Sequence, residues 1–72
     1  MLMKIGDKIV NMDKVQLTRI SSDIVTFDFV DCSYSVTSKK YGEEPADIHI
    51  SKEKFKKLLN ALECMIEDDF IF

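Results

Sequence analysis

A stripe of large apolar residues near the end of the chain is the feature that most restricts its fold. These residues recur every three or four positions, which places them on one face of a helix over residues 52–67. The members of the stripe are Phe55, Leu58, Leu59, Leu62, Met65 and Ile66. Ser51 precedes the stripe and predicts an N-cap, because its hydroxyl can accept a hydrogen bond from a first-turn N–H. Such a one-sided helix requires an apolar surface to pack against.

The residues before the helix are expected to supply that surface as β-strands. Residues 15–20 and 46–50 alternate between apolar and polar side chains, and a weaker strand is expected over residues 8–12. The strongest strand signal covers residues 24–36, which are rich in β-branched and aromatic side chains. The sequence therefore predicts a single α+β domain over residues 1–72. Its architecture would be a small, mostly antiparallel four-stranded β-meander packed by one C-terminal amphipathic helix.

The alternation within residues 24–36 changes phase in the middle of the segment. Val25 and Phe27 are apolar at odd positions, whereas from Val30 onwards the apolar residues occupy even positions. A strand has a period of two residues, so both sets cannot lie on one buried face of an uninterrupted strand. A bulge or bend near Phe29 and Val30 is the favoured explanation. The alternative is a sheet with both faces covered, which would imply a partner.

The cysteines and the single histidine restrict cross-links and metal sites. Cys32 and Cys64 are expected to be reduced thiols in the core or at its boundary, and a disulfide between sheet and helix is the alternative. His49 is the only histidine, and no Cys-x-x-Cys or His-x-x-x-His spacing occurs. We therefore expect neither a metal nor a cofactor.

Candidates for catalysis are few. With only Gly6 and Gly42, neither a P-loop nor a dinucleotide fingerprint can be built. His49 could serve as a base, and Asp28 and Asp31 could form an acid pair. An exposed strand position for the histidine and a solvated face for the acids are the simpler interpretations. No catalytic residue and no enzymatic activity are predicted.

Charge is distributed unevenly along an acidic chain. The net charge of −3 disfavours a nucleic-acid partner bound through bulk electrostatics. Six lysines nevertheless gather in one third of the chain, and the last fifteen residues contain no basic residue. The clustered lysines are Lys39, Lys40, Lys52, Lys54, Lys56 and Lys57. The sequence therefore predicts a polarised surface.

Two segments are expected to contact a partner. Residues 38–45 form the clearest loop, since Gly42 and Pro45 interrupt regular structure there, and loops often carry binding residues. Its expected contacts are Lys39, Lys40, Tyr41, Glu43 and Glu44. The second segment is the apolar tail 70–72, where Phe70 and Phe72 are the expected contacts. This tail either covers the edge of its own core, or it adds a strand to a neighbouring chain or fills a groove on it.

These patterns favour a small, non-enzymatic protein–protein interaction module. Its partner would be another protein or a second copy of the chain in a homodimer, and a phage or mobile-element inhibitor of a host protein is one concrete form. The alternative is a protein that binds or sequesters a small anionic ligand, a nucleotide, through Lys39, Lys40 and Tyr41. No signal-peptide segment opens the chain, and no apolar run approaches the ~20 residues of a membrane span. A cytoplasmic protein without membrane contact is expected.

Overall fold

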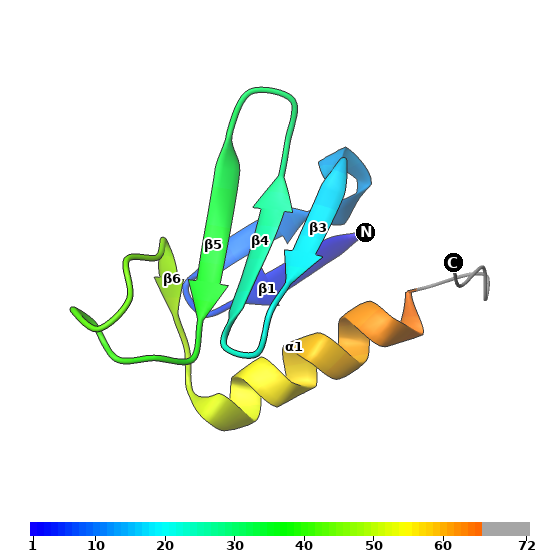
Figure 1. The fold of residues 1–72 in the computed structure, drawn as a ribbon. Helices are drawn as coiled ribbons and strands as arrows, with labels where there is room; N and C mark the ends of the chain where they lie inside the picture. Colours follow the sequence, from blue (N-terminus) through cyan, green and yellow to red (C-terminus); the bar gives the residue numbers. More distant parts are fainter. Residues whose placement is uncertain (66–72) are drawn as a thin grey trace.

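The computed structural model describes residues 1–65, which form two β-sheets and one α-helix (Figure 1). The first sheet is a hairpin of β1 (Leu2–Ile5) and β2 (Lys8–Asn11). A short 3-10 helix, η1 (Met12–Lys14), leads into the second sheet. The strands of that four-stranded sheet are β3 (Leu17–Ile20), β4 (Ile24–Asp28), β5 (Ser33–Thr37) and β6 (Ile48–His49). The helix α1 (Lys52–Cys64) follows β6.

The α+β class with one C-terminal helix is confirmed, whereas the detail of the sheet differs from the prediction. The strands β3, β4 and β5 are antiparallel neighbours, but β6 pairs with β5 in parallel orientation. The four-stranded sheet is therefore mixed rather than a purely antiparallel meander. The expected strand over residues 8–12 belongs to the separate hairpin, where it pairs with Leu2–Ile5, a segment not expected to be a strand.

A chain reversal explains the change of phase within residues 24–36. The segment is two strands, β4 and β5, joined by a turn in which the Phe29 N–H donates to the Cys32 carbonyl at 2.8 Å. Because the chain reverses at this turn, Val25 and Val36 become partners on one face. The predicted bend in a single strand is wrong, and a second covered face is not needed to explain the pattern.

The hydrophobic core lies between one face of the four-stranded sheet, the β1–β2 hairpin and α1. Three sheet residues, Val25, Phe27 and Val36, have no exposed surface. The whole buried apolar set is Ile5, Val10, Val25, Phe27, Val36, Ile48, Phe55, Leu58 and Leu62. Full burial of a side chain such as Phe27 contributes roughly 1.5–3 kcal/mol relative to its exposure.

The helix begins where the sequence predicts. The Ser51 hydroxyl accepts a hydrogen bond from the Lys54 N–H at 3.2 Å, which confirms the N-cap. Met65 is 38% exposed and does not belong to the buried stripe. The predicted continuation to residue 67 and the expected contacts Phe70 and Phe72 lie outside the described residues. Within residues 1–65, no helix is long and apolar enough to span a membrane.

Both cysteines are free and exposed to solvent. Cys32 lies in the turn between β4 and β5, and Cys64 lies at the end of α1. The expected core or boundary position is therefore wrong for both, and the alternative of a disulfide between them is not formed.

The tip of the β1–β2 hairpin lies against β6. Gly6 has a φ of +60°, a backbone conformation that favours glycine. A Cβ atom at this position would lie 3.1 Å from Ile48 Cγ2 and 3.3 Å from Ile50 Cγ2. A side chain here would be strained by the backbone conformation, and its Cβ atom would require the two isoleucine methyl groups to shift slightly.

Candidate functional site

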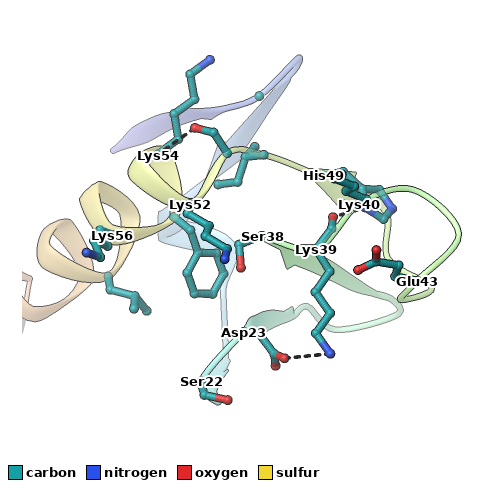
Figure 2. Close-up of a pocket in the computed structure, with 15 residues that line it drawn as sticks. Ser22, Asp23, Ser38, Lys39, Lys40, Glu43, His49, Lys52, Lys54 and Lys56 are labelled. Carbon is teal, nitrogen blue, oxygen red and sulfur yellow. Dashed lines mark hydrogen bonds and ion pairs between the residues drawn. The ribbon is translucent and has the colours of Figure 1, made fainter.

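A groove of about 1020 Å³ opens between the first half of α1, the β3–β4 turn and the loop after β5 (Figure 2). Phe55 and Leu59 of α1, together with Ile50, give it an apolar lining. Apart from Gly6, the other lining residues are polar, and lysine is the most frequent of them, so we call this feature the lysine groove. Its lysines are Lys39, Lys40, Lys52, Lys54 and Lys56.

The lysine groove concentrates positive charge on a chain whose net charge is −3. The carboxylates that line it are those of Asp23 and Glu43. Lysines that cluster in the sequence thus also cluster in space, except Lys57, which lines a smaller groove beside β1. Exposed ammonium groups attract anions over about 8–10 Å at moderate ionic strength.

One lysine of the groove is paired with a carboxylate. Lys39 Nζ lies 3.1 Å from Asp23 Oδ2, and Figure 2 shows this contact reaching across to the β3–β4 turn. The hydrogen bond to Asp23, followed by its negative charge, raises the pKa of Lys39 above 10.5. Both side chains remain partly exposed, so the pair adds little to stability but restrains the direction of the lysine.

Thr37 connects the β3–β4 turn to the loop after β5 beneath the groove. Its side chain is fully buried, and its hydroxyl donates to the Asp23 carbonyl at 2.8 Å. The same hydroxyl accepts a hydrogen bond from the Lys39 N–H at 3.2 Å. The buried hydroxyl therefore uses its donor and one acceptor position, as buried polar groups generally do. This pair of bonds fixes the backbone from which Lys39 extends.

The aromatic residue of the loop stacks on the only histidine. The ring centroids of Tyr41 and His49 are 4.3 Å apart, and the ring planes meet at 25°. His49 Nδ1 donates to the Lys39 carbonyl at 3.0 Å. Tyr41 nevertheless remains 87% exposed. The loop after β5 is thus attached to β6 by one ring stack and one hydrogen bond.

The structure brings together part of the expected partner-binding set. Lys39, Lys40 and Glu43 line the lysine groove. Tyr41 and Glu44 lie on the same loop but are not part of the lining. Ser22 and Asp23, which do line it, were not expected. They carry no sequence signal of such a role, because only the fold brings the β3–β4 turn to the start of α1.

The histidine is not arranged with an acidic neighbour for proton transfer. The Asp47 carboxylate accepts a hydrogen bond from the Ser35 N–H at 2.8 Å. The His49 ring is engaged by Tyr41 and the Lys39 carbonyl. Asp47 and His49 are thus each engaged by a different part of the structure.

Asp28 and Asp31, the two candidate acids, also have different surroundings. The Asp28 carboxylate accepts two hydrogen bonds of 3.0 Å from Arg19 and one of 2.5 Å from the Ser33 hydroxyl. The Ser33 hydrogen bond, and then the Arg19 guanidinium, lower the pKa of Asp28 below 3.8. Asp31 lies instead in the exposed β4–β5 turn. Among residues 1–65, no group of three or more His, Cys, Asp or Glu side chains could hold a metal ion.

Comparison of this chain with protein-family models, curated proteins and solved structures finds no match. The functional argument therefore depends on the chemistry of the groove. Distributed ammonium groups around an apolar lining can bind a molecule that carries several negative charges and some apolar surface.

Proposed function

We propose that this chain is a cytoplasmic, non-enzymatic protein-interaction module that binds an acidic segment of a partner protein in the lysine groove. The observation that supports this proposal is the gathering of five lysines around one open groove on an acidic chain. The carboxylates of such a segment complement the lysines, and its apolar side chains can pack on Phe55 and Leu59. A phage or mobile-element inhibitor of a host protein is one form that such a module takes.

The spread of the lysines favours an extended ligand over a single compact anion. In Figure 2, Lys54 and Lys56 lie on the helix, whereas Lys39 and Lys40 lie on the opposite side of the groove. A compact phosphate site requires several donors that converge on one position. A polypeptide segment with spaced carboxylates can meet lysines on both sides at once. Such rim charges contribute more to orientation and association rate than to affinity.

The alternative proposal is a protein that binds or sequesters an anionic nucleotide through Lys39, Lys40 and Tyr41. One observation favours it: the Tyr41 ring is 87% exposed, so a base could stack on the ring face that His49 leaves free. Two observations weaken it. The Lys39 ammonium already contacts Asp23, and Tyr41 does not line the groove.

The test measures binding of a fluorescein-labelled poly-glutamate peptide by fluorescence anisotropy, with a poly-lysine peptide and ATP as comparison probes. We expect saturable binding of poly-glutamate that weakens as salt is added, because the lysines are exposed to solvent. The double variant Lys40→Glu/Lys52→Glu should bind about tenfold more weakly, which corresponds to roughly 1.4 kcal/mol. Lys8→Glu/Lys14→Glu is the matched control, since it makes the same change in net charge at two exposed lysines that do not line the groove.

The outcomes separate the two proposals. Equal binding by the double variant and the Lys8→Glu/Lys14→Glu control would rule out the lysine groove as the binding site. Binding of ATP that exceeds that of poly-glutamate and is lost in Tyr41→Ala would establish the nucleotide alternative instead.

A further inference from the structure

The open edge of the four-stranded sheet is a surface separate from the lysine groove. β3 is the outermost strand in the order β3-β4-β5-β6, so one side of its backbone has no strand partner within residues 1–65. Leu17, Arg19 and Ile20 are exposed, and Thr18 is half-buried. None of these residues lines the groove. An uncovered row of backbone N–H and C=O groups is a template for another strand.

The hydrogen bonds of β3 show which backbone groups point away from the sheet. The Ser21 N–H donates to the Ile24 carbonyl at 2.9 Å, which marks this pair as hydrogen-bonded. Hydrogen-bonded and non-hydrogen-bonded pairs alternate along an antiparallel ladder. Arg19 is therefore in the next hydrogen-bonded pair with β4, and the N–H and C=O groups of Thr18 and Ile20 point outward.

The same strand exposes apolar side chains on both faces of the sheet. Leu17 and Ile20 are each 56% exposed. The register places Ile20 beside Val25 on the core face and Leu17 beside Asp28 on the outer face. A strand paired with β3 would therefore cover apolar surface on both sides while it satisfied the outward backbone groups.

The edge also lacks the residues that commonly prevent strand pairing. Lysine and proline commonly prevent strand pairing at exposed edges, and β3 contains neither. Its one charged side chain, Arg19, is occupied by two hydrogen bonds to Asp28 of the neighbouring strand. The Arg19 guanidinium is thus directed toward β4 and not outward from the open edge.

We propose that β3 is a homodimer interface, at which β3 of a second copy pairs in antiparallel orientation and joins the two sheets. A two-fold axis beside Arg19 places Thr18 of one copy opposite Ile20 of the other. A second copy is favoured as the occupant because it brings its own exposed Leu17 and Ile20 to the edge without an unpaired charge, since its Arg19 is bonded to Asp28. Thr18 and Ile20 supply the outward donors and acceptors on each side, as an isologous interface requires. The two Arg19 side chains lie directly opposite each other in this register, and the two hydrogen bonds of each to its own Asp28 offset the repulsion between them.

The test follows the mass of the full chain by native mass spectrometry and sedimentation velocity over a range of concentrations. We expect a dimer whose fraction grows with concentration. Thr18→Pro should be monomeric, because proline removes the outward N–H of Thr18 and leaves the bonds between β3 and β4 in place. Thr18→Val is the matched control and should dimerise, since valine keeps both the N–H and the β-branched shape.

A second pair of variants keeps the test decisive if the proline variant fails to fold. Ile20→Lys places a charge on the edge and should be monomeric with an unchanged circular dichroism spectrum. Ile9→Lys should still dimerise, because Ile9 is 70% exposed on β2, away from this edge. Amide hydrogen exchange at Thr18 and Ile20 should slow in the dimer relative to the Ile20→Lys monomer.

Two results would overturn the proposal. The first is a wild-type chain that stays monomeric at every concentration, as it would if another segment or a foreign strand covered the edge. The second is a dimer that persists in both Thr18→Pro and Ile20→Lys, which would assign the association to a different surface.

Discussion

The two edges of the four-stranded sheet are built differently. The β6 edge is only two residues long, and we call it the closed edge because Ile48 is 3% exposed and the hairpin tip at Gly6 lies against that side chain. The stack of Tyr41 on His49 attaches the preceding loop to the same strand. The β3 edge has four residues, and its Ile20 is 56% exposed.

The contrast shows that residue type alone does not decide what an edge strand does. Both edges carry isoleucine, but only the isoleucine of β6 meets the hairpin and the helix. The closed edge contributes to stability through long-range packing and lies next to the lysine groove. Within residues 1–65, nothing pairs with the outward backbone groups of the open edge, so they can accept another strand. A domain this small can thus use one edge for its own core and leave the other for association.

The largest expected effect comes from replacing an isoleucine by alanine at each edge of the sheet. Ile48→Ala should reduce the free energy of unfolding by about 2–5 kcal/mol, because it leaves a cavity in the core. Ile20→Ala should change it by less than about 0.5 kcal/mol in the monomer, because more than half of that side chain is already in water. Urea unfolding at low protein concentration measures both. Similar losses at the two positions would contradict the difference between the edges.

A smaller effect is expected at the buried hydroxyl next to the closed edge. Thr37→Val should cost about 1–3 kcal/mol, because the Lys39 N–H loses its acceptor and the Asp23 carbonyl loses a donor. Thr26→Val is the matched control, since its half-buried hydroxyl has only a 3.4 Å contact with the Ser35 hydroxyl. Urea unfolding should rank Thr37→Val as the more damaging change. The reverse ranking would show that the Thr37 bonds do not fix this end of the sheet.

The smallest effect concerns the side-chain bridge between β3 and β4. The pKa of Asp28 lies below 3.8 because the ionised carboxylate accepts hydrogen bonds from Ser33 and Arg19. Its stabilising contribution is therefore complete above the unfolded-state pKa and is lost as the pH falls through the lower folded-state pKa. An NMR titration of the Asp28 carboxyl carbon should show the lowered value, and Ser33→Ala should raise it towards 3.8.

Ser35→Ala is the control for this titration, because the Ser35 hydroxyl does not bond to Asp28. An Asp28 pKa at or above 3.8 in the wild type would show that the open edge lacks this bridge in solution.

The sequence predicts the helix well because its determinants are local. The cap at Ser51 and the spacing of Phe55, Leu58 and Leu62 need no information from the rest of the chain. The hairpin within residues 24–36 resembles one strand in the sequence, because its turn contains no glycine, proline or asparagine and only one common turn residue, Asp31. The sequence also does not predict that β6 pairs with β5 in parallel orientation, since nothing local specifies which edge a two-residue strand joins.

The candidate site was only partly predictable, because some of its residues come together only through the fold. The clustering of the lysines is visible in the sequence, because Lys52, Lys54 and Lys56 begin one helix soon after the loop of Lys39 and Lys40. The opposite wall of the groove comes from the β3–β4 turn, distant in sequence. The open edge was also hidden, because an exposed strand and a central strand can have the same composition.

The close approach at Gly6 has a consequence for the chain as it leaves the ribosome. The hairpin that carries Gly6 is made first, but Ile48 and Ile50, against which it lies, are made much later. An isolated two-stranded hairpin is marginal in water, and domains assemble as the chain is synthesised from its N-terminus. The first strands therefore remain uncovered until Ile48, Ile50 and the residues of α1 have been synthesised. The nascent chain reaches its native packing only when β6 and α1 have emerged from the exit tunnel.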